Sequence, residues 1–528
     1  MSDEAMSEQA VSEQAESWWS RRAVLTVSAA ALLLYGSTAA PGLTWAHFGA
    51  DGGDLLAAAV TNGVPHPSGY PLYILLLQGW LGLGCALLPL EPARLGTLLS
   101  VLCAGLSAGL TVATAAYLLR DPHCAPHQPA PWARPLWAAL AGLAWMAAPL
   151  VWSQAIITEV YALHMLLAAL IGWAALTGRG RLLALALGLG VAHHVTSVLL
   201  WPAVLWWLWP ARSARLARIG RIFGAALLIG GVLYLRIPWA AAAAPPVNWG
   251  YADTVEGFWW LVSGQAYRGY LFGVPLADLP GRAASWAQVL AAQFTPLGLG
   301  VALAGLAAWD RHWPRLRTFG LLWVVPVSLY SITYYTVDSQ IYLLPVIWMA
   351  ALWFANGLAV GVDWLQRRSA ALWPGRAARV TPQRMALALA ALVAVGLTSV
   401  AALRLPELSL RQDRAAQDFL AAAAATLEPN SLVISRSDAQ TFALWYGVWG
   451  SDALDGVPGL VLINDALYHF DWYRRLLADL YPQVPGIGGP FYDLLRANAA
   501  LRPVFLAEPL TDLPGARQAA GPFWRLEP

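Results

Sequence analysis

Repeated apolar runs long enough to cross a lipid bilayer are the feature that most limits how this chain can fold. A membrane helix needs about twenty predominantly apolar residues. Runs of this kind occupy 23–40, 70–90, 94–119, 135–157, 159–177, 181–209, 219–239, 287–309, 317–336, 341–361 and 385–404. Only 12% of the 528 residues are charged, against about 25% in soluble domains. The sequence therefore predicts an all-α polytopic membrane protein with about 11–13 membrane helices, half-helices included.

Arginine clusters predict which loops face the cytoplasm, because basic residues concentrate on that side of a membrane. The clusters are Arg21/Arg22, Arg179/Arg181, Arg212/Arg215/Arg218/Arg221, Arg311/Arg315/Arg317 and Arg367/Arg368/Arg376/Arg379/Arg384. This assignment leaves 41–69 and 240–287 as external loops. It also predicts a multi-pass plasma-membrane protein with a disordered cytoplasmic tail (1–20), a transmembrane domain (21–404) and an external or periplasmic domain (405–528). The first apolar run lacks a small-residue cleavage site and is interpreted as an anchor.

Two segments conflict with simple alternation across the membrane. Arginines flank both ends of 181–209, so we expect a hairpin of two half-helices that turns near Gly190–His194. A broken helix at membrane depth is tolerated only where it lines a protein cavity. Between 70 and 134, two crossings would place Arg120 and Arg134 outside. One of these two runs is therefore expected to be short or re-entrant, and which one is left open.

The part of the chain after about residue 405 is more polar and alternates short apolar strands with helices. Strands are predicted at 431–435, 459–463 and 503–506, and helices at 414–427 and 468–480. This alternation is typical of a small α/β domain. The net charge of +2 and the lack of a basic tract give no support for nucleic-acid binding. Cys85, Cys103 and Cys124 are too widely spaced to indicate a disulfide framework or a zinc site.

The segment 51–71, DGGDLLAAAVTNGVPHPSGYP, places ionisable groups directly beside apolar runs. Such groups cost about 2.5–3.5 kcal/mol each at the centre of a span, so they usually have a partner or a task. Asp51 and Asp54 are candidates for a general base and the residue that orients it. Taken alone, Asp51 is more readily explained as the N-cap of a helix over 52–62, because capping is the commonest reason for Asp before an apolar run. His66 lies in a proline-rich turn that could hold an imidazole against a phosphate, or that only reverses the chain.

Three further places carry polar groups beside or within apolar runs. Glu159 and Tyr161 form a second acidic point, although a glutamate that opens a span can simply complement the helix N-terminus. His193 and His194 lie at the predicted helix break, which favours a functional role. Asp338 is a weaker instance of the same situation. The membrane part lacks a phosphate-cradling glycine loop and a nucleotide fold, so a lipid-borne donor is favoured over a soluble one.

These motifs resemble a known family. Asp51-Gly52-Gly53-Asp54, followed by Gly63-Val64-Pro65-His66-Pro67-Ser68-Gly69-Tyr70-Pro71-Leu72-Tyr73, is similar to the signature of the protein O-mannosyltransferase-like membrane family of the GT-C superfamily, also called transmembrane protein 260-like. Glu159–Leu163, the His194 region, Asn248–Gly250 and Asp438–Tyr446 resemble its later blocks. The chain departs from the family at Asp54, where Glu is usual, and at Ser68, where Pro is usual.

The resemblance implies a GT-C fold, a polyprenyl-phosphate sugar donor and Asp51 as the catalytic base of an inverting transfer. Mannose is the expected sugar, and the hydroxyl acceptor is expected on a protein or an envelope glycan. Position and chemistry assign donor or acceptor binding to His66, Tyr70, Glu159, Tyr161, His194 and Asp338. No cofactor is assigned, and a divalent metal ion is left open. Two other classes stay open: a transporter or flippase of lipid-linked sugars, and a non-catalytic scaffold.

Overall fold

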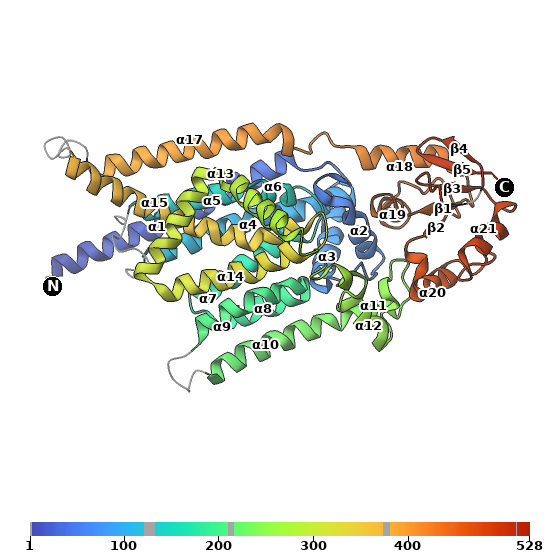
Figure 1. The fold of residues 1–528 in the computed structure, drawn as a ribbon, viewed down its shortest axis with the longest axis horizontal. Helices are drawn as coiled ribbons and strands as arrows, with labels where there is room; N and C mark the ends of the chain where they lie inside the picture. Colours follow the sequence, from blue (N-terminus) through green and yellow to red (C-terminus); the bar gives the residue numbers. More distant parts are fainter. Residues whose placement is uncertain (1–2, 121–131, 210–215, 373–380, 514, 528) are drawn as a thin grey trace.

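The computed structural model describes residues 3–120, 132–209, 216–372, 381–513 and 515–527. A long helical bundle carries the N-terminus at one end and a small mixed domain with the C-terminus at the other (Figure 1). Arg212, Arg215, Arg376 and Arg379, predicted to be cytoplasmic, and Cys124 lie outside the described residues. We call the two ends the N-terminal end and the outer end of the bundle.

The bundle consists of apolar helices of unequal length. They are α1 (Asp3–Thr38), α3 (Pro71–Leu87), α4 (Pro92–Arg120), α5 (Arg134–Met146), α6 (Pro149–Ala155), α7 (Tyr161–Leu176), α8 (Gly180–His193), η2 (Val195–Leu200), α9 (Trp201–Leu208), α10 (Leu216–Tyr234), α11 (Arg236–Ala241), α13 (Leu279–His312), α14 (Pro314–Thr333), η6 (Ser339–Leu343), α15 (Leu344–Leu372) and α17 (Pro382–Leu408). Within the described residues, six helices are long and apolar enough to cross a membrane, or seven if the bent pair α5 and α6 is one span. The predicted fold, a polytopic helical membrane protein with a small C-terminal α/β domain, is confirmed.

The N-terminal segment differs from its prediction as a disordered tail. Residues 3–20 form the first part of α1, which continues without a break to Thr38. Alanine, glutamate and glutamine recur in this segment, and all three are good helix formers. Local propensity thus extends the first membrane helix beyond its apolar run.

The run 181–209 forms a hairpin, as the flanking arginines predict. Its chain breaks at His194, whose backbone is extended (φ −146°, ψ 121°) between α8 and η2. Gly178, just before α8, and Leu208, at the end of α9, line the same cavity at the N-terminal end of the bundle. The chain therefore enters along α8, turns at the outer end and returns along η2 and α9.

The run 70–90 is the one that does not cross. The helix α3 begins at the outer end, and α4 after it begins there too, because the Ala93 backbone N–H donates to the Tyr446 hydroxyl of the C-terminal domain (3.2 Å). The other end of α4 lies beside the first arginines, since Arg120 donates to the Ser20 hydroxyl (3.2 Å). Leu83 and Leu87 of α3 are exposed, as suits a helix that lies in lipid at the outer surface. Arg120 thus joins the other basic clusters.

The C-terminal domain is a five-stranded sheet covered by helices. Its strand order is β2-β1-β3-β5-β4. The strands are β1 (Leu432–Ser435), β2 (Val461–Asn464), β3 (Val504–Leu506), β4 (Arg517–Ala520) and β5 (Phe523–Leu526), and the helices are α18 (Ala415–Thr426), α19 (Asp438–Trp445), η7 (Tyr446–Gly450), η8 (Leu467–His469), α20 (Asp471–Leu480) and α21 (Phe491–Ala499). The strands β1, β2 and β3 are parallel, with Val433 opposite both Leu462 and Phe505. The hairpin of β4 and β5 was not predicted, because Arg-Gln-Ala-Ala in β4 lacks alternating apolar residues.

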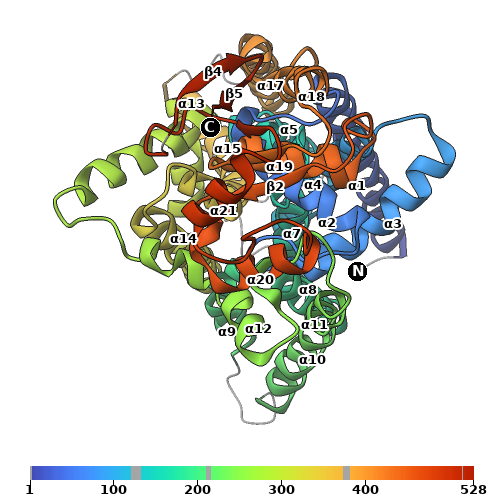
Figure 2. The same cartoon turned by 90° about the vertical axis from the view of Figure 1, so that its right-hand side faces the viewer.

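The segment 46–60 lies between the bundle and the C-terminal domain, where η1 (Ala46–Asp51) leads directly into α2 (Gly52–Val60). Figure 2, which views the molecule from the outer end, shows α19 and α20 over α2 and α7. The loop 240–278 contributes η4 (Trp249–Tyr251), α12 (Val255–Val262) and η5 (Gln265–Tyr270) to the same end. The segment 46–60 is therefore covered from both sides.

Candidate active site

Asp51 and Asp54 flank one imidazole at the outer end of the bundle. Asp54 Oδ2 lies 2.7 Å from His66 Nδ1, and Asp51 Oδ2 lies 3.4 Å from His66 Nε2. The Asp51 side chain is 38% exposed, whereas the Asp54 side chain is fully buried. The three residues form a line of alternating charge that runs from the protein interior to an accessible carboxylate.

Both carboxylate oxygens of Asp54 accept hydrogen bonds, and these bonds fix the proline-rich loop. The Asp54 Oδ2 atom accepts a hydrogen bond from the His66 backbone N–H (2.9 Å) and is also the partner of the His66 ring nitrogen Nδ1. The other oxygen, Oδ1, accepts a hydrogen bond from the Trp249 indole N–H (3.0 Å). Trp249 lies in the external loop after α11, and its backbone N–H donates to the Val64 carbonyl (3.1 Å). Asp54 therefore joins two segments at the outer end and holds the His66 ring in a fixed orientation.

Asp51 does not act as a helix cap. It occupies the N-cap position of α2, but within the described residues its side chain makes no capping hydrogen bond. The carboxylate instead faces His66. Of the two explanations that the sequence left open, capping is therefore not realised, and a role at the site remains.

The electrostatics of this line keep a charged imidazole beside a weakly acidic carboxyl group. Partial burial raises the pKa of Asp51 to about 6; the His66 charge opposes this shift, and the Asp438, Asp54 and Asp338 carboxylates add to it. Burial alone would lower the pKa of His66, but Asp51 and the hydrogen bond to Asp54 together raise it to about 9. His66 is therefore an imidazolium at neutral pH, and Asp51 exchanges its proton close to neutral pH.

The two glycines of the DGGD motif allow two other segments to approach the carboxylates. A Cβ atom on Gly53 would lie 2.3 Å from the Phe442 carbonyl oxygen of α19, and one on Gly52 would lie 2.9 Å from the Thr158 carbonyl oxygen. Only residues without a side chain permit these approaches. The motif thus brings α19 to one side of Asp51 and the segment before Glu159 to the other.

The helix α19 contributes the part of the site that belongs to the C-terminal domain. Phe442 stacks on His66 with ring centroids 6.4 Å apart and an interplanar angle of 15°. Asp438, at the start of α19, is exposed, and its charge interacts with those of Asp51 and His66. The C-terminal domain is therefore a component of the site as well as a cover over it.

A cluster of tyrosine and histidine rings lies beside the acidic line. The His194 ring is 5.7 Å from Tyr70, 5.9 Å from Tyr161, 5.9 Å from Tyr342 and 5.2 Å from His164. We call these five residues the ring cluster. Tyr70 also lies 5.1 Å from the His66 ring, so it joins the ring cluster to the carboxylates.

The two adjacent histidines have different surroundings. His193 is fully buried, and its Nε2 lies 2.8 Å from the Val160 carbonyl oxygen. His194 Nδ1 lies 2.7 Å from the Thr196 hydroxyl and 3.4 Å from the Thr196 backbone nitrogen, so Nε2 is the ring nitrogen left to face a ligand. His193 therefore joins two helices inside the bundle, and His194 is the member of the pair that belongs to the ring cluster.

Glu159 and Asp338 border the same region. Glu159 is buried; its Oε2 accepts the Val160 backbone N–H (3.0 Å), whereas Oε1 has no hydrogen-bond partner among the described residues. The interaction with the N-terminus of α7 therefore explains the position of one oxygen of the Glu159 carboxylate and leaves the other unexplained. Asp338 is half-buried just before η6, which carries Tyr342. Its charge acts on Asp51, as that of Glu159 acts on His66.

The structure thus brings together all eight residues assigned from the sequence and adds several that were not assigned. Trp249, Phe442, His164 and Tyr342 were missed as site residues. His164 follows Tyr161 by three residues and so shares its helix face, which is a signal the sequence did contain. Across the described residues, no group of three or more His, Cys, Asp and Glu side chains is arranged to hold a metal ion.

Comparison with solved structures identifies the class of this fold, which is GT-C. The chain is similar to ArnT from Cupriavidus metallidurans bound to undecaprenyl phosphate, with a TM-score of 0.55, 15% identity, and 95% of this chain and 97% of that chain covered. It is also similar to the Archaeoglobus fulgidus oligosaccharyltransferase in complex with Zn and sulfate, with a TM-score of 0.51, 12% identity, and 92% and 67% covered. At such identities the likeness establishes the fold.

The family comparison is more specific. Residues 51–216 match the family model described as Protein O-mannosyl-transferase TMEM260 N-terminal domain. The match begins at Asp51 and extends past His194, and it confirms the resemblance predicted from the DGGD motif. No curated protein sequence matches the chain.

Proposed function

We propose that this protein is a membrane glycosyltransferase that moves a sugar from a polyprenyl-phosphate donor to a hydroxyl acceptor. The observation that carries the proposal is the accessible Asp51 carboxylate, 3.4 Å from His66 and supported from behind by the buried Asp54. The description of the matching family supports mannose as the sugar and protein Ser/Thr as the acceptor. The fold shared with a protein bound to undecaprenyl phosphate supports a polyprenyl-phosphate donor.

The proposed reaction is a single inverting displacement. Asp51 accepts the proton of the acceptor hydroxyl, whose oxygen attacks the anomeric carbon from the face opposite the phosphate. The new glycosidic C–O bond forms as the bond between the anomeric carbon and the phosphate oxygen breaks. The electron pair of that bond leaves with the polyprenyl phosphate, and the configuration at the anomeric carbon inverts. A base with a pKa of about 6 is ionised at neutral pH and can still accept a proton.

The remaining residues have supporting roles in this proposal. The His66 imidazolium adds positive charge near the phosphate, and the His194 Nε2–H can donate to the donor phosphate both before and during transfer. Tyr70 and Tyr161 offer ring faces for the sugar. The free Glu159 Oε1 and the Asp338 carboxylate can accept hydrogen bonds from sugar hydroxyls. Asp54 holds His66 in place without touching the substrate.

The site lies at the end of the bundle opposite the basic clusters, so the reaction is proposed for the external face of the plasma membrane. The positive-inside rule places the basic N-terminal end in the cytoplasm. The predicted division into a transmembrane domain over 21–404 and an external domain over 405–528 follows the same orientation. The helix α17 ends at Leu408, within a few residues of that boundary.

The test is sugar transfer by the purified full chain in detergent, where no compartments exist and a transporter would give no product. Radiolabelled polyprenyl-phosphate mannose serves as the donor and a membrane extract as the acceptor pool. Asp51→Asn is expected to lower transfer by about 10²–10⁴-fold, as for loss of a general base, while donor binding persists. Asp471→Asn, at a 93% exposed carboxylate of α20, is the matched control and is expected to transfer normally. Equal transfer by Asp51→Asn and the wild-type protein would refute the proposal.

A further inference from the structure

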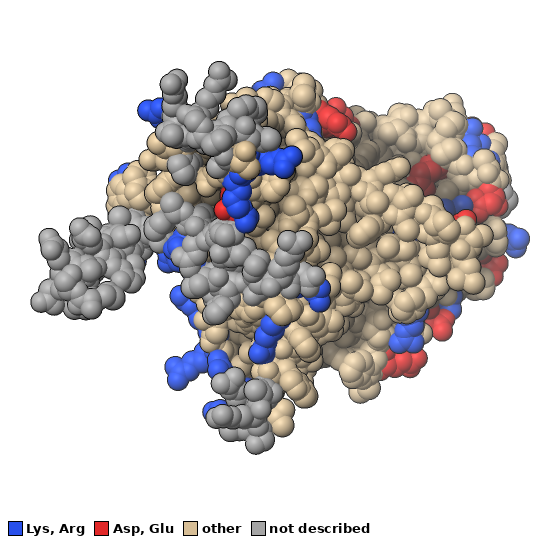
Figure 3. Space-filling view, turned by 60° about the vertical axis from the view of Figure 1, so that its left-hand side comes forward, with Lys and Arg blue, Asp and Glu red and all other residues tan. Residues whose placement is uncertain are grey.

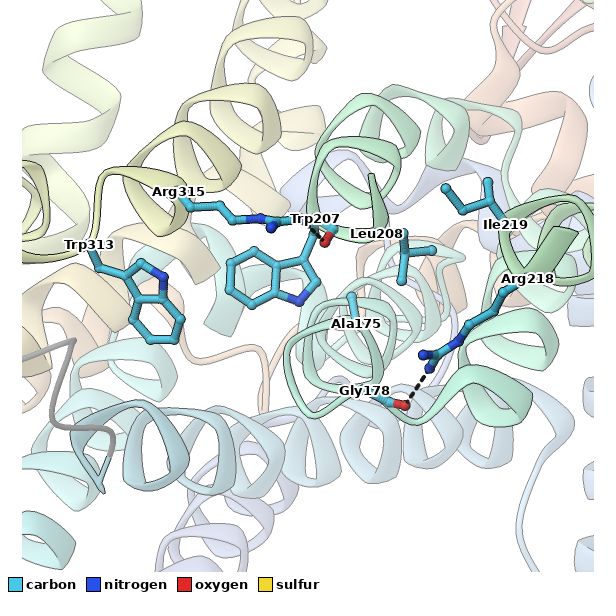
Figure 4. Close-up of a pocket in the computed structure, with 8 residues that line it drawn as sticks. All are labelled: Ala175, Gly178, Trp207, Leu208, Arg218, Ile219, Trp313 and Arg315. Atoms are coloured by element: carbon cyan, nitrogen blue, oxygen red, sulfur yellow. Dashed lines mark hydrogen bonds between the residues drawn. The ribbon is translucent and has the colours of Figure 1, made fainter. Parts of the chain in front are cut away.

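A second cavity lies at the N-terminal end of the bundle, away from the candidate active site. It has a volume of about 350 Å³ and is formed where the ends of α7 and α9 meet the starts of α10 and α14. Trp207, Leu208, Arg218, Ile219, Trp313 and Arg315 form its walls (Figure 4). Nothing in the proposed transfer reaction uses this cavity.

Two guanidinium groups enter the cavity from opposite sides, as Figure 4 shows. Arg218 Nη2 donates to the Gly178 carbonyl (3.1 Å) after α7, and Arg315 Nη2 donates to the Trp207 and Trp209 carbonyls (both 2.8 Å) at the end of α9. These bonds cap two helix C-termini, where cations are favoured. They also hold both charges at the cavity wall.

Within the part of the chain that the structure describes, neither guanidinium is neutralised by a carboxylate. Among the described residues, Arg218 and Arg315 form no ion pair, and their hydrogen bonds use only Nη2. The Nε and Nη1 donors of both side chains stay available within this part of the molecule. Two such groups facing one cavity suit a phosphate, which accepts several charge-assisted hydrogen bonds.

The other walls and the rim are apolar and aromatic. The Trp207 and Trp313 rings lie 5.7 Å apart, and Leu208 and Ile219 complete the wall. Trp209 at the rim is 59% exposed. Tryptophan is enriched where a protein meets lipid headgroups. A soluble anion would not require such surroundings, whereas a phosphate attached to a lipid would.

The cavity also lies within the basic end of the molecule. Figure 3 shows Arg side chains gathered at this end, while the middle of the bundle is largely uncharged and both signs of charge mix at the C-terminal domain. The positive-inside rule assigns this end to the cytoplasmic leaflet, whose anionic lipids attract clustered arginines. The charge of the cavity and its location therefore both favour a phosphate that is attached to a lipid.

We propose that this cavity binds the phosphate headgroup of an anionic glycerophospholipid of that leaflet. Arg218 and Arg315 hold the phosphate from opposite sides, and the two tryptophans contact the glycerol and the first acyl carbons. The lipid thereby bridges α7, α9, α10 and α14 at their converging ends. This site is independent of the proposed transfer reaction.

Native mass spectrometry of the full chain, with phosphatidylglycerol or phosphatidylcholine added at equal concentration, tests the proposal. The wild-type protein is expected to retain phosphatidylglycerol at least about tenfold better than phosphatidylcholine. Arg218→Gln/Arg315→Gln is expected to lose most of this preference, because it removes both positive charges that face the phosphate. The matched control is Arg181→Gln, an exposed arginine at the same end that does not line the cavity, and it is expected to keep the preference. Equal retention of the two lipids, or an unchanged preference in the double variant, would overturn the proposal.

A second variant separates lipid binding from helix capping. Leu208→Trp leaves both arginines in place and narrows the cavity with a larger side chain, so it is expected to weaken phosphatidylglycerol binding even if the double arginine variant does not fold. Undiminished phosphatidylglycerol binding by Leu208→Trp would contradict a site in this cavity. Inorganic phosphate is the third arm: at millimolar concentration it is expected not to displace the lipid. Displacement would identify a soluble phosphate site and refute the lipid assignment.

Discussion

The candidate site has two halves that are built differently. The acidic line of Asp54, His66 and Asp51 is held by short hydrogen bonds and opposite charges, whereas the ring cluster around His194 is held by ring contacts of 5.2–5.9 Å. In the first half one buried carboxylate, that of Asp54, is hydrogen-bonded by two segments, through His66 and Trp249. In the second half several rings share one surface.

This difference separates positioning from binding. A buried carboxylate with both oxygens hydrogen-bonded holds its neighbours in place, and its removal disturbs charge as well as geometry. A surface of rings tolerates changes because each contact contributes little alone. Substitutions in the acidic line should therefore affect turnover and folding, and substitutions in the ring cluster should affect affinity.

The largest effect is expected for Asp54→Asn. An amide cannot neutralise His66 and leaves an imidazolium, or an unpaired ring, in a buried position. Breaking a buried ion pair costs roughly 3–5 kcal/mol, so the unfolding temperature in detergent should fall together with transfer. Asp418→Asn removes an exposed carboxylate that pairs with Arg414 at 3.9 Å and is expected to change stability by less than about 1 kcal/mol. Similar melting temperatures for the two variants would show that Asp54 does not hold the acidic line.

Gly53→Ala tests whether the acidic line depends on contact with the C-terminal domain. The added Cβ would lie 2.3 Å from the Phe442 carbonyl oxygen, so α19 must move away from His66. A misplacement of about 1 Å can cost 10²-fold in rate, and transfer is expected to fall by up to about that factor. Gly79→Ala in α3 is the control, because a Cβ there meets nothing within 4 Å. Unchanged transfer by Gly53→Ala would exclude a role for the α19 contact.

The membrane topology shows which features the distribution of arginines along the sequence can predict and which it cannot. Arginines at both ends of 181–209 were sufficient to predict a hairpin, because an even number of crossings is required between two cytoplasmic ends. The same count showed that one run between 70 and 134 does not cross but could not choose between them. That choice depends on a contact between Ala93 and Tyr446, 353 residues apart in the sequence. The sequence therefore predicts whether the number of crossings between two charged loops is even or odd. It does not predict which residues each helix end contacts.

The candidate site shows the same limit. Asp51, Asp54 and His66 were identified because ionisable residues beside apolar runs are conspicuous. Their arrangement depends on Trp249, whose indole reaches Asp54 across 195 positions, and on α19 of the C-terminal domain. Neither contact follows from local spacing. The sequence thus identified which groups are present, and the tertiary fold determines which carboxylate is accessible and which is enclosed.

The pH profile of transfer is expected to be bell-shaped because the two ends of the acidic line titrate separately. Below about pH 6 Asp51 gains a proton and cannot act as a base, and above about pH 9 His66 loses its charge. Rates should fall about tenfold per pH unit beyond either limit. His66→Gln is expected to abolish the alkaline limb and to move the acidic limb to higher pH, because the His66 charge lowers the pKa of Asp51. A wild-type profile that is flat from pH 5 to pH 10 would contradict both assignments.

The stability of the folded protein should decrease over the same alkaline pH range in which the transfer rate falls. The pKa of His66 is raised on folding from an ordinary value near 6.5 to about 9, so the stabilisation from its ion pairs is complete below about pH 6.5. It is lost as the pH rises through about 9. The melting temperature in detergent should therefore decline between pH 7 and pH 9.5, and His66→Gln should remove this decline. A decline of equal size in both proteins would assign it to other groups.

The smallest effect is expected for His194→Phe, which keeps a ring in the ring cluster and removes the Nε2–H donor. Loss of one hydrogen bond to a charged phosphate corresponds to about 1.5 kcal/mol or more, so the KM for the donor should rise about tenfold while kcat changes little. His469→Phe, at an exposed histidine of the C-terminal domain, is the matched control. If His194→Phe lowers kcat as strongly as Asp51→Asn and leaves KM unchanged, the division between a positioning half and a binding half is wrong. A rise in KM alone would place the phosphate beside the ring cluster, because only there does His194 provide a donor that phenylalanine lacks.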